Sequence, residues 1–72
     1  MKVEAVTLHF QPGVTSLGGT QFVSFSEGKV YQDLHYITRE GQHVVNYSDP
    51  VTGKRHGIGF PMADIRQTNT TL

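Results

Sequence analysis

Cysteine and tryptophan are absent from this 72-residue chain, which also has no long apolar run and no excess of either charge. The absence of cysteine excludes disulfide bonds and thiolate metal sites. Six Lys and Arg balance six Asp and Glu. The chain therefore lacks the basic excess that is typical of nucleic-acid-binding proteins. No apolar stretch approaches the roughly 20 residues that a membrane-spanning helix needs.

The length fits a single domain, residues 1–72, near the lower limit for a chain that folds without a disulfide bond, a metal site or self-association. A core of this size gives only about 3–5 kcal/mol of net stability. Good packing or self-association must supply the additional stability. We expect that a homodimer through edge strands is one way to achieve it. Residues 1–4 lack the apolar segment of a signal peptide. These features favour a cytoplasmic protein without membrane association.

Short segments rich in β-branched and aromatic residues predict an all-β fold of five or six antiparallel strands. Residues 2–10 form the first strand, with Val6, Leu8 and Phe10 on one side. The Gly-rich residues 11–20 form a long loop, without the Lys and Ser/Thr of a phosphate-binding loop. The remaining expected elements are strands at 21–25, 30–38, 43–47 and 56–60, a single 3₁₀ turn at 61–64, and a tail at 66–72 that pairs as an edge strand or frays.

Turn sequences predict how the strands pair, because side chains alternate strictly across a sheet. A two-residue loop at Glu40-Gly41 places Thr38 opposite His43, and the longer Asp-Pro loop places Tyr47 opposite His56. A third two-residue loop, at residues 27–28, places residue 25 opposite residue 30. All three hairpins then agree on one apolar face.

That apolar face consists of Val23, Phe25, Val30, Leu34, Tyr36, Val45, Tyr47, Ile58 and Phe60. The opposite face is mixed: Phe22, Ser24, Tyr31, Asp33, His35, Ile37, Val44, Asn46, Gly57 and Gly59. Its two glycines leave a strip without side chains. We interpret them mainly as sites of strand curvature, and alternatively as a groove for the backbone of a partner.

The segment around Pro61 resembles the closing segment of SH3-like small barrels. In that family a glycine and an apolar strand end meet a proline, a 3₁₀ turn follows, and an apolar residue opens the last strand. Gly59, Phe60, Pro61 and Ile65 match these positions. The resemblance implies a barrel with a long first loop. Because the chain has no Trp and the first loop has no acid, proline-rich peptide binding is not carried over.

Asp33, His35 and Asn46 share one strand face in this pairing, which would suit acid–base chemistry. No nucleophile lies beside them, and the histidines lack the spacing of metal ligands. A solvated polar cluster is the simpler interpretation. We therefore expect no enzymatic activity, no cofactor and no metal site.

Lys54, Arg55 and His56 form the one cationic cluster, at the end of a hairpin. Beside aromatic residues, such a cluster supports single-stranded nucleic-acid binding as an alternative function. The zero net charge argues against it.

The sequence favours a small binding module that acts on another protein as an interaction, inhibitory or regulatory factor. An interface core typically combines aromatic and apolar groups with a polar rim. Small size, balanced charge and the lack of a cofactor motif resemble the accessory proteins of mobile genetic elements such as phages. The expected binding residues are Phe22, Tyr31, His35, Ile37, Asn46, Lys54 and Arg55.

Overall fold

The computed structural model describes residues 1–15 and 18–72, and the predicted loop 11–20 thus contains two residues outside the described part. Six strands and one 3₁₀ turn confirm the expected all-β class. No helix in the described ranges is long and apolar enough to cross a membrane. The elements are β1 (Ala5–Phe10), β2 (Phe22–Ser26), β3 (Gln32–Arg39), β4 (Gln42–Ser48), β5 (Arg55–Pro61), η1 (Met62–Asp64) and β6 (Ile65–Thr71).

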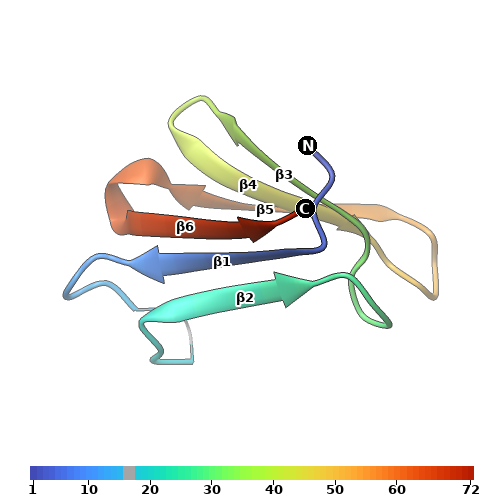
Figure 1. The fold of residues 1–72 in the computed structure, drawn as a ribbon, viewed down its shortest axis with the longest axis horizontal. Coiled ribbons are helices and arrows are strands. Elements are labelled where there is room, and N and C mark those ends of the chain that lie inside the picture. Colours follow the sequence, from blue (N-terminus) through green and yellow to red (C-terminus); the bar gives the residue numbers. More distant parts are fainter. Residues whose placement is uncertain (16–17) are drawn as a thin grey trace.

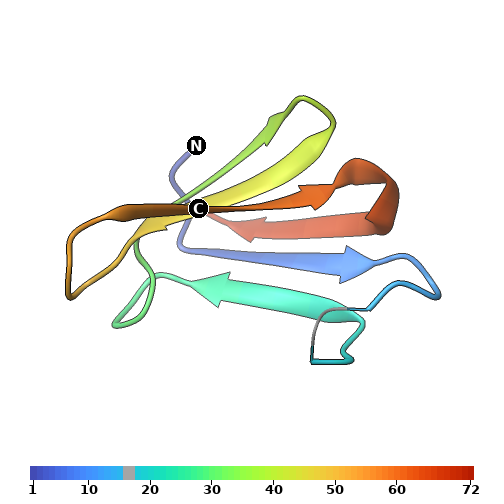
Figure 2. The ribbon, with the colours of Figure 1, turned by 180° about the vertical axis from the view of Figure 1, so that it is seen from behind.

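The strands form two three-stranded antiparallel sheets, ordered β2-β1-β6 and β3-β4-β5. The sheets face each other across one core (Figure 1; Figure 2). The C-terminal tail is a strand, because β6 pairs with the whole of β1. The expected closed barrel is not formed by the described residues. The reason is that β2 pairs with β1 and not with β3, so the ladder is interrupted between the two sheets.

The alternating sequence of β1 builds the centre of the core. Val6 and Leu8 are fully buried and Phe10 nearly so, whereas the intervening residues face outward. Leu34 and Val45 meet them from the opposite sheet and are also fully buried. Burying each such side chain stabilises the fold by about 1.5–3 kcal/mol.

Two of the three predicted hairpins are confirmed. Thr38 pairs with His43 across the β3–β4 turn, and Tyr47 pairs with His56 between β4 and β5. The β3–β4 turn has positive φ at both of its central residues, 52° at Glu40 and 76° at Gly41. This is the turn geometry that matches the twist of a two-residue hairpin.

The third predicted hairpin is wrong. Phe25 pairs with Val6 of β1, and Val30 lies outside any strand. After β2 the chain makes a turn in which the Gly28 N–H donates to the Tyr31 carbonyl, 3.0 Å away. The next strand then joins the other sheet, which a tight hairpin would not allow.

A β-bulge near the start of β3 reverses the predicted orientation of the residues before it. Gln32 pairs with Ser48 and His35 pairs with Asn46, so two residues of β3 lie opposite one residue of β4. An extra residue in one strand moves every preceding side chain to the other face. Tyr31, expected on the mixed face, therefore packs against the core. Val30, expected on the apolar face, is 64% exposed.

The N-terminal residues lie along the free edge of β3 and link the two sheets. The Val3 N–H donates to the Leu34 carbonyl at 3.1 Å, and the Tyr36 N–H donates to the Met1 carbonyl at 2.9 Å. These bonds fix Lys2 next to His35. The segment then continues directly into β1.

Replacement of Tyr31 tests the bulge. Its ring meets those of Phe25 and Tyr47 edge-on, with centroids 5.1 and 4.7 Å apart. Two aromatic pairs at about 0.5–1.5 kcal/mol each predict that Tyr31→Ala loses about 1–3 kcal/mol in urea unfolding. The control Val30→Ala should change stability little. If Val30→Ala cost as much as Tyr31→Ala, the strand would follow the unbulged pairing instead.

Candidate functional site

Four of the seven predicted binding residues lie together on the outer face of the β3-β4-β5 sheet. His35 pairs with Asn46, and Ile37 lies two residues along the same face of β3. Arg55 opens β5 and reaches across to both of the other strands. His35, Ile37, Asn46 and Arg55 thus define the outer face of the β3-β4-β5 sheet.

The other three predicted residues lie elsewhere. Phe22 is on the outer face of the other sheet, where its ring is 6.0 Å from that of His9. Tyr31 packs against the core, as described above. Lys54 is in the β4–β5 loop, where its backbone N–H donates to the Thr52 hydroxyl at 3.3 Å and its carbonyl accepts the Asp49 N–H at 2.8 Å.

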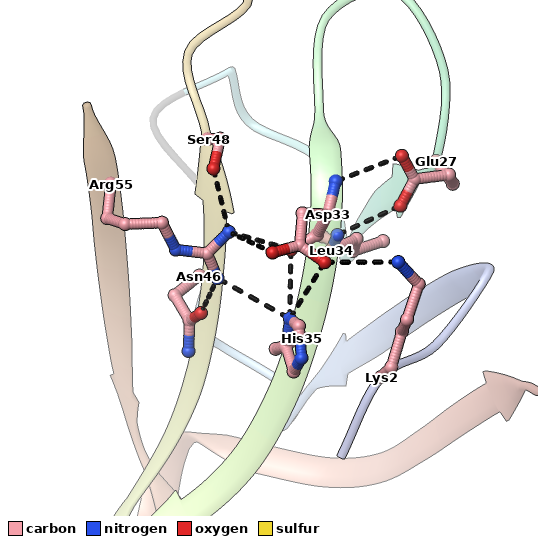
Figure 3. A network of polar contacts seen from close by, with 8 residues as sticks. All are labelled: Lys2, Glu27, Asp33, Leu34, His35, Asn46, Ser48 and Arg55. Atoms are coloured by element: carbon pink, nitrogen blue, oxygen red, sulfur yellow. Dashed lines mark hydrogen bonds and ion pairs between the residues drawn. The ribbon is translucent and has the colours of Figure 1, made fainter. Parts of the chain in front are cut away.

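The carboxylate of Asp33 is the centre of a polar network on this surface (Figure 3). It lies between two cations, 3.0 Å from Lys2 Nζ and 3.2 Å from Arg55 Nη1. Lys2 comes from the N-terminal segment and Arg55 from β5. The network therefore joins segments that are far apart in the sequence.

Arg55 spans the sheet from β5 to β3. Its Nη1 donates to the Asp33 carbonyl and to the Ser48 hydroxyl, each at 2.9 Å, and its Nη2 donates to Asn46 Oδ1. The planar guanidinium offers several donors in a fixed arrangement, which suits such multiple contacts. Arg55 is thus held in place and its charge is offset by a carboxylate.

Glu27 holds the bulge from the side. Its two carboxylate oxygens accept the backbone N–H groups of Asp33 at 3.0 Å and Leu34 at 2.9 Å (Figure 3). A bulge leaves adjacent N–H groups without their ladder partners. One carboxylate satisfies both. Asp33 is held with φ at 52°, a left-handed conformation that Asp tolerates better than most residues.

The imidazole of His35 is oriented by the backbone. Its Nδ1 is 2.9 Å from the Asp33 carbonyl oxygen, to which it can donate only when protonated. Nδ1 is also 3.4 Å from Arg55 Nη2, which is itself a donor. The shorter contact favours the Nδ1–H form, which leaves Nε2 of a neutral ring as the acceptor. His35 Nδ1 is also 3.9 Å from Asp33 Oδ1, the carboxylate oxygen that lies 3.0 Å from Lys2 Nζ.

These contacts shift the protonation of three groups. The hydrogen bond from Lys2 lowers the pKa of Asp33 below its usual value, and the same contact raises the pKa of Lys2. The backbone N–H of Leu34 is the main cause that lowers the pKa of Glu27. Both carboxylates are thus stabilised in their charged form.

Beside the network, the outer face carries apolar side chains and glycines. Ile37, 45% exposed, pairs with Val44, which pairs with Gly59 on β5. The predicted glycine groove is only half present. A Cβ at Gly59 would come within 2.6 Å of Gln42 Oε1, so the Gln42 side chain covers that position. Gly57 has no atom within 4 Å of its Cβ position and remains open.

The remaining histidines, His9, His43 and His56, each contact neighbouring side chains. Tyr36 Oη is 2.6 Å from His43 Nδ1, and the two rings stack. His56 Nε2 is 3.7 Å from Asp49 Oδ2. Within the described ranges, no three His, Cys, Asp or Glu side chains are grouped in a way that would hold a metal ion.

Sequence reasoning missed Glu27, Lys2 and Ser48. Lys2 contacts Asp33, 31 residues away, and no local pattern links the two. The sequence predicts a hairpin turn at Glu27 because a glycine follows it. Only the bulge, which is not visible as a pattern, explains why a carboxylate is needed there.

The lowered pKa values predict that the fold loses stability in acid. A carboxyl group whose pKa is lower in the folded state stabilises the protein above its unfolded pKa and loses this contribution as the pH falls. Urea unfolding should therefore show stability falling below about pH 4.5, the ordinary value for Glu27. Glu27→Gln should be less stable at neutral pH and less sensitive to acid. The control is Glu4→Gln, whose carboxylate has no hydrogen bond to a described residue. If the stability of Glu27→Gln fell in acid as steeply as that of the wild type, the hydrogen bonds from Glu27 to the bulge would not explain the acid dependence.

Comparison of the chain with protein-family models, with curated proteins and with solved structures finds no match.

Proposed function

We propose that this protein is a non-enzymatic binding module that docks another protein on the outer face of the β3-β4-β5 sheet, as an inhibitory or regulatory factor. The observation that carries the proposal is an exposed apolar strip beside a polar group fixed in advance. Ile37 and Val44 form the strip, and Arg55 is held by Asp33 at its edge. Interfaces combine an apolar centre with an ordered polar rim, and preformed geometry lowers the entropy cost of binding.

The charge pattern favours a protein partner over a nucleic acid. Arg55 and Lys2 both contact the Asp33 carboxylate, so two of the six basic residues are offset locally. Of the aromatic residues of the alternative hypothesis, Phe22 lies on the outer face of the other sheet, and Tyr31 and Tyr36 pack against the core. A single-strand-binding surface needs cations and exposed aromatic rings side by side.

We further propose that the architecture is an opened variant of the SH3-like barrel. The element order supports this, with a long loop between β1 and β2 and a 3₁₀ turn between β5 and β6. In this interpretation β2 and β3 correspond to one strand that is interrupted by residues 27–31. The interruption is the segment that carries Glu27 to the bulge.

Gly57→Thr separates binding from folding. Position 57 has open space for a side chain and does not use positive φ, so a β-branched residue should be tolerated in the strand. We expect stability to rise by about 0.5–1 kcal/mol, because glycine is unfavourable in a strand. We also expect at least a tenfold loss of affinity for the partner, because the side chain would stand in the contact surface. Stability is measured by urea unfolding, and binding by capture from the cells that naturally produce the protein, followed by titration.

Ile37→Glu and Val51→Glu form a matched pair of charge insertions. Val51 is 90% exposed in the β4–β5 loop, outside the proposed surface. Ile37→Glu should lose the captured partner and Val51→Glu should keep it. Equal capture by both variants and by Gly57→Thr would refute the surface. Capture that disappears as salt rises, with nucleic acid in the eluate, would support the alternative function.

A further inference from the structure

A cavity that is open to solvent lies between residues of the two sheets, on the opposite side of β5 from the proposed protein-binding surface. It has a volume of about 500 Å³. Residues of both sheets, of η1 and of the described part of the loop after β1 line it. The lining residues used below are Phe10, Val23, Phe25, Ile58, Phe60 and Asp64.

The wall of the cavity is aromatic and aliphatic. The ring of Phe60 is central, with centroids 6.0 Å from Phe10 and 6.4 Å from Phe25. Phe10 and Phe25 are almost fully buried, whereas Phe60 is only half-buried because the space in front of it is not filled by the described residues. The volume falls within the range of small-molecule pockets, about 300–1,000 Å³.

Asp64 gives the cavity a charge. It is the one titratable side chain among the described lining residues, and it is half-buried at the end of η1. Its backbone carbonyl accepts the N–H of Gln11 at 2.8 Å, which fixes the residue against the loop. Its carboxylate makes no hydrogen bond or ion pair with the described residues. This contrasts with Asp33 and Asp49, whose carboxylates all have partners.

We propose that this cavity binds a small apolar molecule that carries one ammonium group, with the apolar part against the three phenylalanines and the ammonium beside Asp64. A carboxylate next to a low-dielectric cavity attracts a cation more strongly than one in open water. An anionic ligand of the same shape would meet repulsion from Asp64, so the charge of the ligand determines whether it binds.

The test uses a matched pair of probes, 4-phenylbutylamine and 4-phenylbutyrate, titrated into the full chain and followed by two-dimensional amide NMR. The amine should bind and shift the resonances of β2, β5 and η1, and the carboxylate should bind at least tenfold more weakly. Asp64→Asn should reduce amine affinity to about that of the carboxylate. Val23→Phe, which places a ring in the cavity, should abolish amine binding, whereas Val51→Phe should leave it unchanged. Thermal unfolding of each variant checks that it is folded.

Three results would overturn the proposal. They are equal binding of amine and carboxylate to the wild type, retention of amine binding by Val23→Phe, and no shift with either probe. Sedimentation of the wild type is run in parallel. A dimer that Val23→Phe dissociates would show that a second copy of the chain fills the cavity instead. Gly57→Thr should bind the amine normally. The amine-binding proposal and the protein-binding proposal can therefore fail independently of each other.

Discussion

The structure depends on one carboxylate and two adjacent backbone N–H groups. Glu27 accepts both N–H groups of the bulge, from Asp33 and Leu34. Buried or half-buried backbone donors need a partner, and in a bulge the neighbouring strand cannot supply both. Because Glu27 supplies the acceptors, β3 can hold one extra residue. That residue turns Tyr31 into the core and directs the Asp33 side chain toward Arg55 and Lys2.

The polar network acts mainly on geometry. Exposed ion pairs contribute little to stability individually, because solvent screens them and ordering the side chains costs entropy. Asp33 is about half exposed, so its contacts to Lys2 and Arg55 belong to this class. Their effect is to place the guanidinium of Arg55 across the β3-β4-β5 sheet in one position. A surface group that is ordered before binding loses less entropy when a partner arrives.

The parts of the fold that the sequence predicts are those that local residues determine. Glu40-Gly41 adopts the positive φ angles that its turn requires, and the alternation around it then fixes β3 against β4 as far as His35. The same holds for Tyr47 opposite His56. The errors begin where a contact is distant in sequence. No local sequence pattern indicates that β2 pairs with β1 or that Glu27 holds a bulge. The sequence therefore predicts the wrong face of the sheet for both Val30 and Tyr31. The candidate site was predicted to the same extent: His35, Ile37 and Asn46 follow from the β3–β4 hairpin, whereas Lys2 and Glu27 do not.

The two proposed sites share strand β5, and this has a physical consequence. The residues of β5 alternate in direction: Ile58 and Phe60 line the cavity, whereas Gly57 and Gly59 lie on the outward side. At Gly57 and Gly59 the outward side of β5 therefore has little packing, apart from the Gln42 side chain over Gly59, whereas Arg55 at the start of the strand reaches across the sheet. The strand is held by β4 on one edge, by its inner residues and by the contacts of Arg55. A ligand against Phe60 and a partner on the outer face, as proposed, would thus contact opposite sides of the same strand.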